Sequence, residues 1–199
     1  IIQNNHYDYI YHEHIFYFTL TSINKVLRNY GLFGFDYFKS PISGGSFVIL
    51  FKKKKKRETS KFKKMINIEI KGKLNSIKNW KKLNQICKEH KRNLNKMINS
   101  LKINKNIAAY GASARSSTLI NFLNQKNQTI KKVFDLNDLK TNLFTPGSHI
   151  KIEKPIAKKI NNYDVIFLLA WNFKDEIIKF LKKIKFKGKI IVPLPNMKL

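Results

Sequence analysis

The chemically richest pattern of the sequence lies near its start. Tyr11 is followed by His12, Glu13 and His14, and His6 lies a short way upstream. A histidine titrates near neutral pH, so an imidazole beside a carboxylate and a phenol suits general acid–base chemistry. In an extended segment His12 and His14 share one face, and with His6 as a third ligand they would suit a metal ion. A polar loop without chemistry is the remaining alternative.

A second group of candidate residues follows a short apolar run in the second half of the chain. Gly111, Ser113 and Arg115 lie where a buried strand is expected to turn into a helix. The free N–H groups and positive dipole end of such a junction suit a phosphate, and the arginine adds a bidentate contact. Asp135 ends the next expected strand, where an acid can accept a ribose hydroxyl, and Asn172 ends another. Only one glycine of a G-x-G-x-x-G pattern is present, so a plain tight turn is an equal alternative.

The elements that must position this second group alternate between strand and helix. The sequence predicts strands over 105–110, 132–135, 163–171 and 189–192, and helices over 116–125 and 173–184. Such alternation is typical of an α/β fold with a parallel sheet of Rossmann type. The run 163–171 is almost continuously apolar, as expected for a strand that is covered on both faces.

The first half of the chain predicts a smaller set of elements. Residues 7–14 alternate enough to be the end of a strand that runs into a loop. A helix fits 19–30, with Leu20, Ile23, Val26 and Leu27 on its apolar face and Gly31 at its end. Strands over 32–38 and 46–51 flank the turn residues 40–45, which favours an antiparallel hairpin. The basic run 52–57 is then a solvated boundary, and 59–101 predicts one or two long amphipathic helices, with a bend at Gly72.

Composition excludes several classes of protein. The chain has 199 residues, of which 43% are hydrophobic, so it has enough apolar material to bury a core. Its single cysteine, Cys87, excludes an internal disulfide and any multi-cysteine zinc or iron–sulfur site. No apolar run approaches the ~18 residues of a membrane-spanning helix, and the first residues lack a signal-peptide pattern. We therefore expect a cytoplasmic protein without a membrane partner.

The formal net charge of +28 is carried almost entirely by lysine. Of 40 basic residues only four are arginine, whereas specific nucleic-acid binders more often use arginine for bidentate contacts. Lysine, asparagine and isoleucine share adenine- and thymine-rich codons, so the base composition of the genome is a sufficient explanation. We expect no specific nucleic-acid partner, and a basic nucleic-acid-associated protein remains an alternative.

Several ordered motifs resemble those of one known family. They are AYGASAR at 109–115, D-x-N-x-x-K at 135–140, TPGSHI at 145–150, LAWNF at 169–173 and IVPLP at 191–195. On these motifs, residues 107–195 resemble the C-terminal domain of S-adenosylmethionine-dependent sugar C-methyltransferases. These enzymes methylate carbon 3 of nucleotide-linked 4-keto deoxysugars. Residues 7–51, with YHEH at 11–14 and the glycine pair at 44–45, resemble the end of the family's methyltransferase domain.

The resemblance implies roles for the candidate residues. His14 would be the base that removes the acidic proton next to the 4-keto group, and the enolate carbon would then attack the methyl group of the donor. Tyr11 and Glu13 would lie around the keto oxygen and the imidazole. Near the sugar nucleotide would lie the substrate-binding residues Gly111, Ser113, Arg115, Asp135 and Asn172.

The resemblance also implies how the chain is organised. Residues 1–52 would be the truncated end of a class I methyltransferase domain, a helix plus a β-hairpin. A basic helical linker would cover 53–102, and a Rossmann-like domain 103–199. The family's zinc-binding cysteines and its S-adenosylmethionine loop would lie before Ile1, so we expect a fragment of a longer enzyme with little activity alone and no metal site.

Two further functional classes stay open at this point. One is a non-catalytic module that binds a nucleotide sugar. The other is a dinucleotide-dependent oxidoreductase, which the incomplete glycine pattern disfavours.

Overall fold

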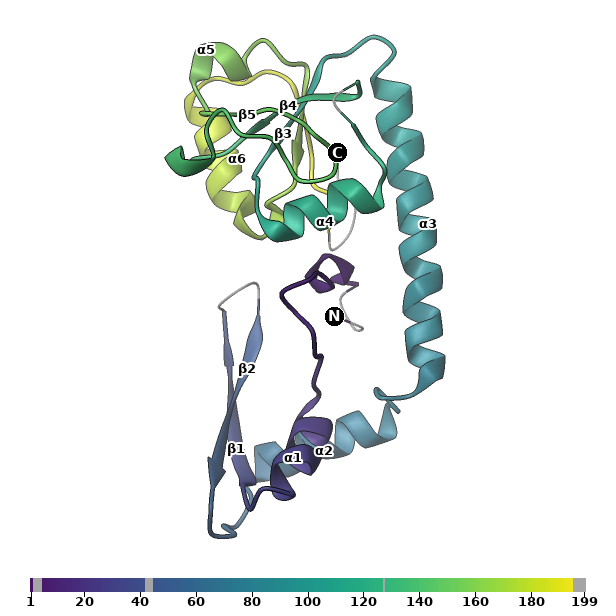
Figure 1. The fold of residues 1–199 in the computed structure, drawn as a ribbon, viewed down its shortest axis with the longest axis vertical. Helices are drawn as coiled ribbons and strands as arrows, with labels where there is room; N and C mark the ends of the chain where they lie inside the picture. Colours follow the sequence, from purple (N-terminus) through teal and green to yellow (C-terminus); the bar gives the residue numbers. More distant parts are fainter. Residues whose placement is uncertain (2–4, 42–44, 127, 195–199) are drawn as a thin grey trace. The chain divides into compact units, whose positions relative to one another are not determined.

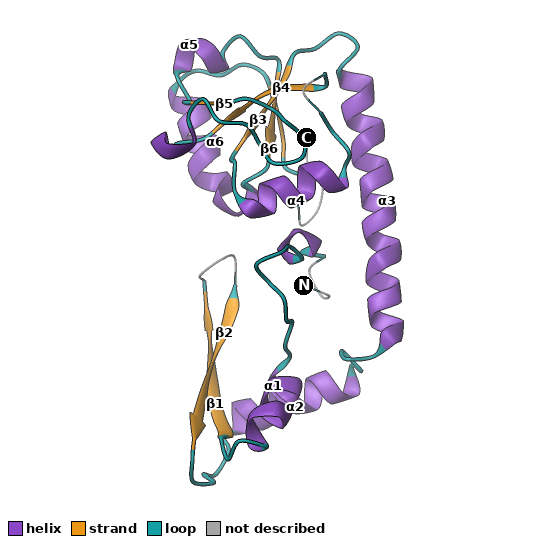
Figure 2. Ribbon diagram, viewed as in Figure 1, coloured by secondary structure: helices purple, strands orange, loops and turns teal. Residues whose placement is uncertain are grey.

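The computed structural model describes residues 1, 5–41, 45–126 and 128–194. Within these ranges the chain divides into two compact units. One contains residues 15–84. The other joins the N-terminal residues 5–14 to residues 85–194, so the start of the chain is packed with its second half. Figure 1 follows the chain through its elements, and Figure 2 separates helix, strand and loop.

The unit of residues 15–84 begins with helix α1 (Leu20–Arg28). Thr19 and Ser22 form a reciprocal capping box at its start, which satisfies N–H groups that a helix leaves unpaired. The predicted helix is confirmed, but one residue of its predicted apolar face is not covered: Val26 is 43% exposed. Asn24 is buried instead, because its side-chain oxygen accepts a hydrogen bond from Gly34 N–H at 3.0 Å.

The predicted antiparallel hairpin is confirmed. Strand β1 (Phe33–Ser40) pairs with β2 (Ser46–Lys52), with Ser40 opposite Ser46 and an irregular register between Gly34 and Asp36. The predicted turn includes 42–44, which lie outside the described residues.

Two helices follow the hairpin, as the lysine-rich pattern predicts. Helix α2 (Ser60–Lys71) is capped by the Thr59 side chain and ends at Gly72, and α3 (Ile77–Leu101) follows after a short turn. Glu69 on α2 is buried and accepts hydrogen bonds from the N–H groups of Leu20 and Thr21, so it links α2 to the start of α1.

The second half forms a five-stranded parallel sheet in the order β5-β4-β3-β6-β7. This is the strand order of a Rossmann-type sheet, in which β4 and β5 are added on one side of the first strand and β6 and β7 on the other. Its strands are β3 (Ile107–Tyr110), β4 (Ile130–Phe134), β5 (Ile152–Glu153), β6 (Val165–Leu168) and β7 (Lys189–Ile191). Its helices are α4 (Ala114–Phe122), α5 (Ala157–Ile160) and α6 (Lys174–Lys183), with 3₁₀ turns η4 (Asp138–Lys140) and η5 (Trp171–Phe173). The predicted α/β fold class is thus confirmed.

The structure corrects several details of the prediction. Residues 7–14 do not extend as a strand, because Tyr7–Tyr9 close a 3₁₀ turn, η2. Helix α4 begins before the predicted residue 116, since Ser113 accepts the Ser116 N–H and caps it. Strand β5 and helix α5 were not predicted; both are too short to show a hydrophobic period.

The core of this unit lies on both faces of the sheet. Every residue of β3 and β6 is buried, which explains why their sequences are apolar without alternation.

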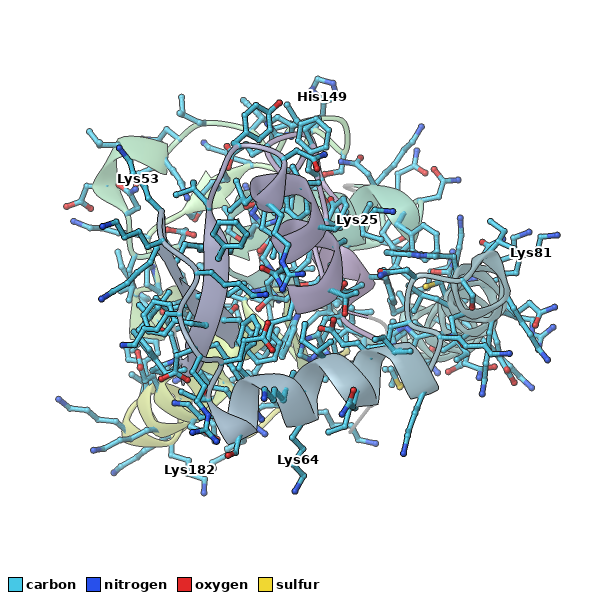
Figure 3. The ribbon with its side chains drawn as sticks, turned by 90° about the horizontal axis from the view of Figure 1, so that it is seen from below. Lys25, Lys53, Lys64, Lys81, His149 and Lys182 are labelled. Carbon is cyan, nitrogen blue, oxygen red and sulfur yellow. The ribbon has the colours of Figure 1, made fainter. Side chains whose placement is uncertain are left out.

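Lysines occupy the outside of the helices in both units. Lys64, Lys81 and Lys182 are exposed and project from their helices in Figure 3. Within the described ranges no helix is long and apolar enough to cross a membrane.

Candidate active site at the carboxyl edge of the parallel sheet

The turn after β3 is held by a close backbone approach. Gly111 has φ +101°, and a Cβ placed there would lie 2.3 Å from the Ala170 Cβ. Only glycine combines this backbone angle with so near a neighbour. The turn therefore ties the end of β3 to the segment that follows β6.

The polar groups around this turn bond one another. One carboxylate oxygen of Asp135 accepts the Ala112 N–H at 2.6 Å, and the other accepts the Asn137 N–H at 2.8 Å. The Lys140 ammonium donates to the Ala112 carbonyl at 2.8 Å, and the Ser113 hydroxyl accepts the Ser116 N–H. Asp135 thus closes the turn where the sequence suggested a ribose contact.

Arg115 is engaged by an acid from the start of the chain. Its Nε and one terminal nitrogen donate to Asp8 Oδ2 at 3.0 and 2.7 Å, and Trp171 Nε1 donates to the same oxygen at 2.8 Å. Asp8 is only 1% exposed. Its Oδ1 has no hydrogen-bond partner among the described residues, so this buried carboxylate retains one acceptor.

Two aromatic rings lie against the same arginine. The guanidinium carbon lies 3.8 Å from the Tyr9 ring centroid and 4.9 Å from the Trp171 ring centroid. His6 adds a third ring, 4.8 Å from Trp171 between centroids, and burial lowers the pKa of His6. Burial also raises the pKa of Tyr9, which Arg115 partly opposes. Residues 5–14 are therefore anchored beside α4, as the purple start of the chain in Figure 1 shows.

The imidazole of His14 is oriented by two groups of its own segment. Its Nδ1 lies 3.0 Å from the Tyr9 carbonyl oxygen, and its Nε2 lies 3.1 Å from the Tyr11 hydroxyl. A carbonyl oxygen only accepts, so Nδ1 carries the proton. In the neutral ring Nε2 is then the acceptor, the state that a general base requires.

Glu13 and His12 lie at the surface of this segment. Their side chains are 64% and 81% exposed, and Glu13 lies 3.9 Å from His12 Nε2. His14 Nδ1 is bonded by the carbonyl of Tyr9. No set of three His, Cys, Asp or Glu side chains in the described part of the chain is arranged to hold a metal ion.

A second histidine anchors the same N-terminal residues. Tyr7 Oη lies 2.8 Å from His90 Nδ1 on α3, and His90 Nε2 lies 2.8 Å from the Pro193 carbonyl oxygen. Nε2 therefore donates to the carbonyl, and Nδ1 accepts from Tyr7 when the ring is neutral. Burial lowers the pKa of His90, against the effect of its bond to Pro193, and so favours that neutral ring.

Two more positions complete the comparison with the sequence. Asn172 lies half-buried in η5 at the carboxyl edge of the sheet, next to Trp171. Sequence reasoning missed Asp8, Tyr9 and His90. For Asp8 the sequence offered one signal, its place between the two aromatic residues Tyr7 and Tyr9. If such a carboxylate is buried with its neighbours, it needs a cationic partner.

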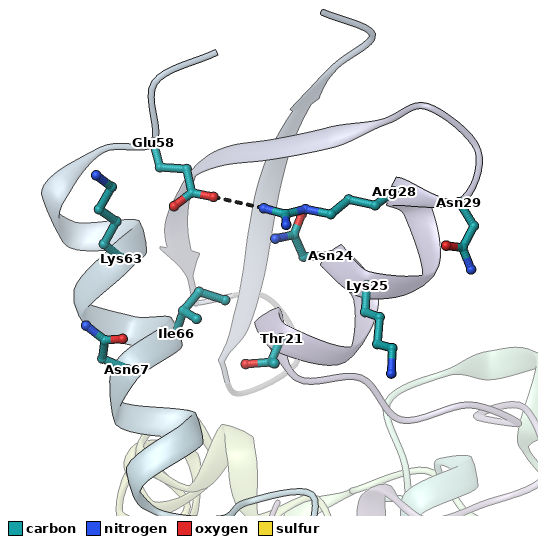
Figure 4. Close-up of a pocket in the computed structure, with 9 residues that line it drawn as sticks. All are labelled: Thr21, Asn24, Lys25, Arg28, Asn29, Glu58, Lys63, Ile66 and Asn67. Atoms are coloured by element: carbon teal, nitrogen blue, oxygen red, sulfur yellow. Dashed lines mark hydrogen bonds and ion pairs between the residues drawn. The ribbon is translucent and has the colours of Figure 1, made fainter. Parts of the chain in front are cut away.

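A separate cleft of about 540 Å³ lies in the unit of residues 15–84. Figure 4 shows it between α1 and α2, with the Arg28–Glu58 ion pair of 3.0 Å at its wall. Lys25 and Lys63 also line it. None of the predicted site residues belongs to this cleft.

The glycine turn does not fit a methyl donor such as S-adenosylmethionine. The Ala112 N–H and the Asp135 carboxylate, which such a donor could use, bond each other, and Ala170 lies against Gly111.

Comparison with known proteins identifies the family. The model of the family described as "C-methyltransferase C-terminal domain" matches residues 41–195. The chain is 26% identical over 200 residues to "C-methyltransferase NovU" of Streptomyces niveus, with 98% of this chain and 48% of that protein covered. The chain thus spans about half the length of this curated relative. The motifs at the carboxyl edge of the sheet and the extent of the family match lead to one conclusion: the chain belongs to the C-methyltransferase family defined by this C-terminal domain.

Proposed function

We propose that this chain takes part in the S-adenosylmethionine-dependent methylation of the carbon next to the keto group of a nucleotide-linked keto-deoxysugar. The observation that carries the proposal is the oriented imidazole of His14, with Nδ1 bound to a carbonyl oxygen and Nε2 beside a phenol. S-adenosylmethionine would supply an electrophilic methyl group. The contribution of the chain's own residues is to generate the carbon nucleophile.

His14 acts as the base in this proposal. The C–H bond next to the keto group breaks, its proton goes to Nε2, and its electron pair passes into the enolate. The Tyr11 hydroxyl, 3.1 Å from Nε2, turns to donate to the enolate oxygen as charge develops there.

The sugar nucleotide is proposed to lie at the carboxyl edge of the sheet, where α/β sheets bind their ligands. Ser113 is exposed and Asn172 half-exposed there, and both offer polar atoms to a hydroxyl or phosphate. Gly111 and Asp135 hold the turn in shape, and Arg115 supports the edge through its contact with Trp171.

Hydrogen–deuterium exchange tests the proposal without needing the methyl donor. A thymidine-diphosphate 4-keto sugar is incubated in D₂O with the purified chain, and loss of the proton at carbon 3 is followed by NMR. We expect exchange faster than in buffer, and we expect His14→Asn to abolish the acceleration. His12→Asn is the matched control, because that neighbouring ring is exposed.

Two results would contradict the assignment. One is unchanged acceleration in His14→Asn. The other is binding of the sugar nucleotide with no acceleration by the wild-type chain, which would favour a non-catalytic nucleotide-sugar-binding module.

A further inference from the structure

We propose that Asp8 and Arg115 are positioning residues for His14. Their ion pair fixes the Tyr9 carbonyl, and that carbonyl selects the tautomer of His14 in which Nε2 accepts a proton. The inference rests on the proposed function only in taking Nε2 as the atom that receives the proton.

The first step is the anchoring of Asp8. Three N–H groups converge on its Oδ2, two from Arg115 and one from Trp171, at 2.7–3.0 Å. All three donors come from the C-terminal half, at the start of α4 and at η5. A buried carboxylate needs such donors to offset its desolvation, so residue 8 has one well-defined position.

The second step passes from residue 8 to residue 9. The same guanidinium that bonds the Asp8 carboxylate stacks on the Tyr9 ring, 3.8 Å from its centroid. Tyr9 is buried, and η2 is closed by the Ile10 N–H bonding the Tyr7 carbonyl at 3.0 Å. One arginine thus holds two successive residues and fixes the peptide plane from which the Tyr9 carbonyl projects.

The third step is the selection of a tautomer. The Tyr9 carbonyl oxygen accepts from His14 Nδ1 at 3.0 Å, and the His14 N–H bonds the Tyr11 carbonyl at 2.9 Å, which closes the turn around the ring. An unrestrained neutral imidazole exchanges between two tautomers. With Nδ1 committed to the carbonyl, the lone pair is on Nε2, the nitrogen that faces the Tyr11 hydroxyl.

This chain of contacts gives Arg115 a role other than phosphate binding. Its Nε and one terminal nitrogen both donate to Asp8, so this edge of the guanidinium is engaged by a buried carboxylate. Arg115 instead acts on the base through two intervening residues.

Nitrogen-15 NMR of the histidine-labelled chain measures the tautomer directly. At a pH where the ring is neutral, we expect wild-type His14 to show a proton on Nδ1 and none on Nε2. In Asp8→Asn, which keeps the shape but removes the charge, the tautomer ratio should shift toward Nε2–H by about fivefold, the effect of losing one ordinary hydrogen bond. Arg115→Lys keeps the charge but loses the planar fork, so it should shift the ratio in the same direction.

A matched control separates positioning from general loosening. Glu153→Gln removes two ion pairs of the same unit, those with Lys132 and Lys159 at 2.9 Å each, without touching the N-terminal segment. It should leave the His14 signals unchanged. Backbone amide spectra of each variant verify that the sheet is intact, and Arg115→Lys decides the matter where Asp8→Asn does not fold.

The outcomes distinguish this inference from the proposed function. An unchanged His14 tautomer in both folded variants would overturn the positioning role, whatever the exchange assay shows. A shifted tautomer with slower carbon-3 exchange and unchanged affinity for the sugar nucleotide would support both. If His14→Asn leaves the carbon-3 exchange rate unchanged, the proposed function is wrong. The positioning role of Asp8 and Arg115 is then still decided by the tautomer measurement alone.

Discussion

The Asp8–Arg115 pair should be the most strongly coupled ion pair of the unit that contains the parallel sheet. Asp8 is 1% exposed, its side chain accepts three hydrogen bonds, and the guanidinium is packed between two rings. Removing one member of a buried pair leaves the other charged and uncompensated, at a cost of about 3–5 kcal/mol. Asp8→Ala and Arg115→Ala should each lower the free energy of unfolding by this amount.

The double variant should be less damaging than the sum of the two single variants. Once both charges are gone no uncompensated charge remains, so we expect an interaction free energy of about 2–3 kcal/mol. Urea unfolding followed by Trp171 fluorescence measures it, in a Trp80→Phe background so that only one tryptophan reports.

The Lys132–Glu153 pair is the comparison within the same sheet. Its side chains are partly exposed, so its coupling should stay at or below about 1 kcal/mol. Additivity of Asp8→Ala and Arg115→Ala within about 0.5 kcal/mol would refute the reasoning, because it would mean that the two side chains do not share one buried contact.

Three further predictions concern the turn, the pH response and the charge. Gly111→Ala should lower the free energy of unfolding by about 2–4 kcal/mol through backbone strain and overlap with Ala170. Gly31→Ala is the control, because Gly31 has φ +71° but open space around it, and it should lower that free energy by only about 1 kcal/mol. Thermal melts of the two variants test the difference. Burial lowers the pKa of His90 below its ordinary 6.5, so the unfolded chain binds more protons than the folded one. The free energy of unfolding is therefore full above pH 6.5 and falls as the pH drops through the lowered pKa. Urea denaturation at a series of pH values should show a steeper fall of this free energy than in His90→Gln, and the same pH dependence in both would contradict the assignment. With a net charge of +28 the chain should bind duplex DNA at low salt and lose about a thousandfold in affinity by physiological salt; a complex that persists there would restore nucleic-acid binding as a function.

Local sequence patterns were sufficient for most of the elements. The glycine at 72 and the apolar runs of β3 and β6 act within a few residues, so they could be recognised without the fold. The alternation of strands and helices then predicted the parallel sheet, and the motifs around it predicted the C-methyltransferase family, which the family match confirms.

The role of the N-terminal segment was decided by tertiary structure. Residues 7–14 have the alternation of a strand, yet Tyr7–Tyr9 form a 3₁₀ turn in which Asp8 accepts hydrogen bonds from two residues far along the chain, Arg115 and Trp171. No local rule connects an aspartate with an arginine and a tryptophan more than a hundred positions away. Burial of that charge required all three to meet.

The sequence by itself determined that His14 can act as a base, that Tyr11 supplies a phenol beside it, and that a glycine turn follows the first strand of the parallel sheet. Only the tertiary structure decided what they contact: Asp135 bonds the glycine turn, Arg115 bonds Asp8, and the Tyr9 carbonyl bonds His14. The physical reason is that a polar group withdrawn from water takes the partner that the fold brings to it, and that partner is set by packing rather than by neighbours in the chain.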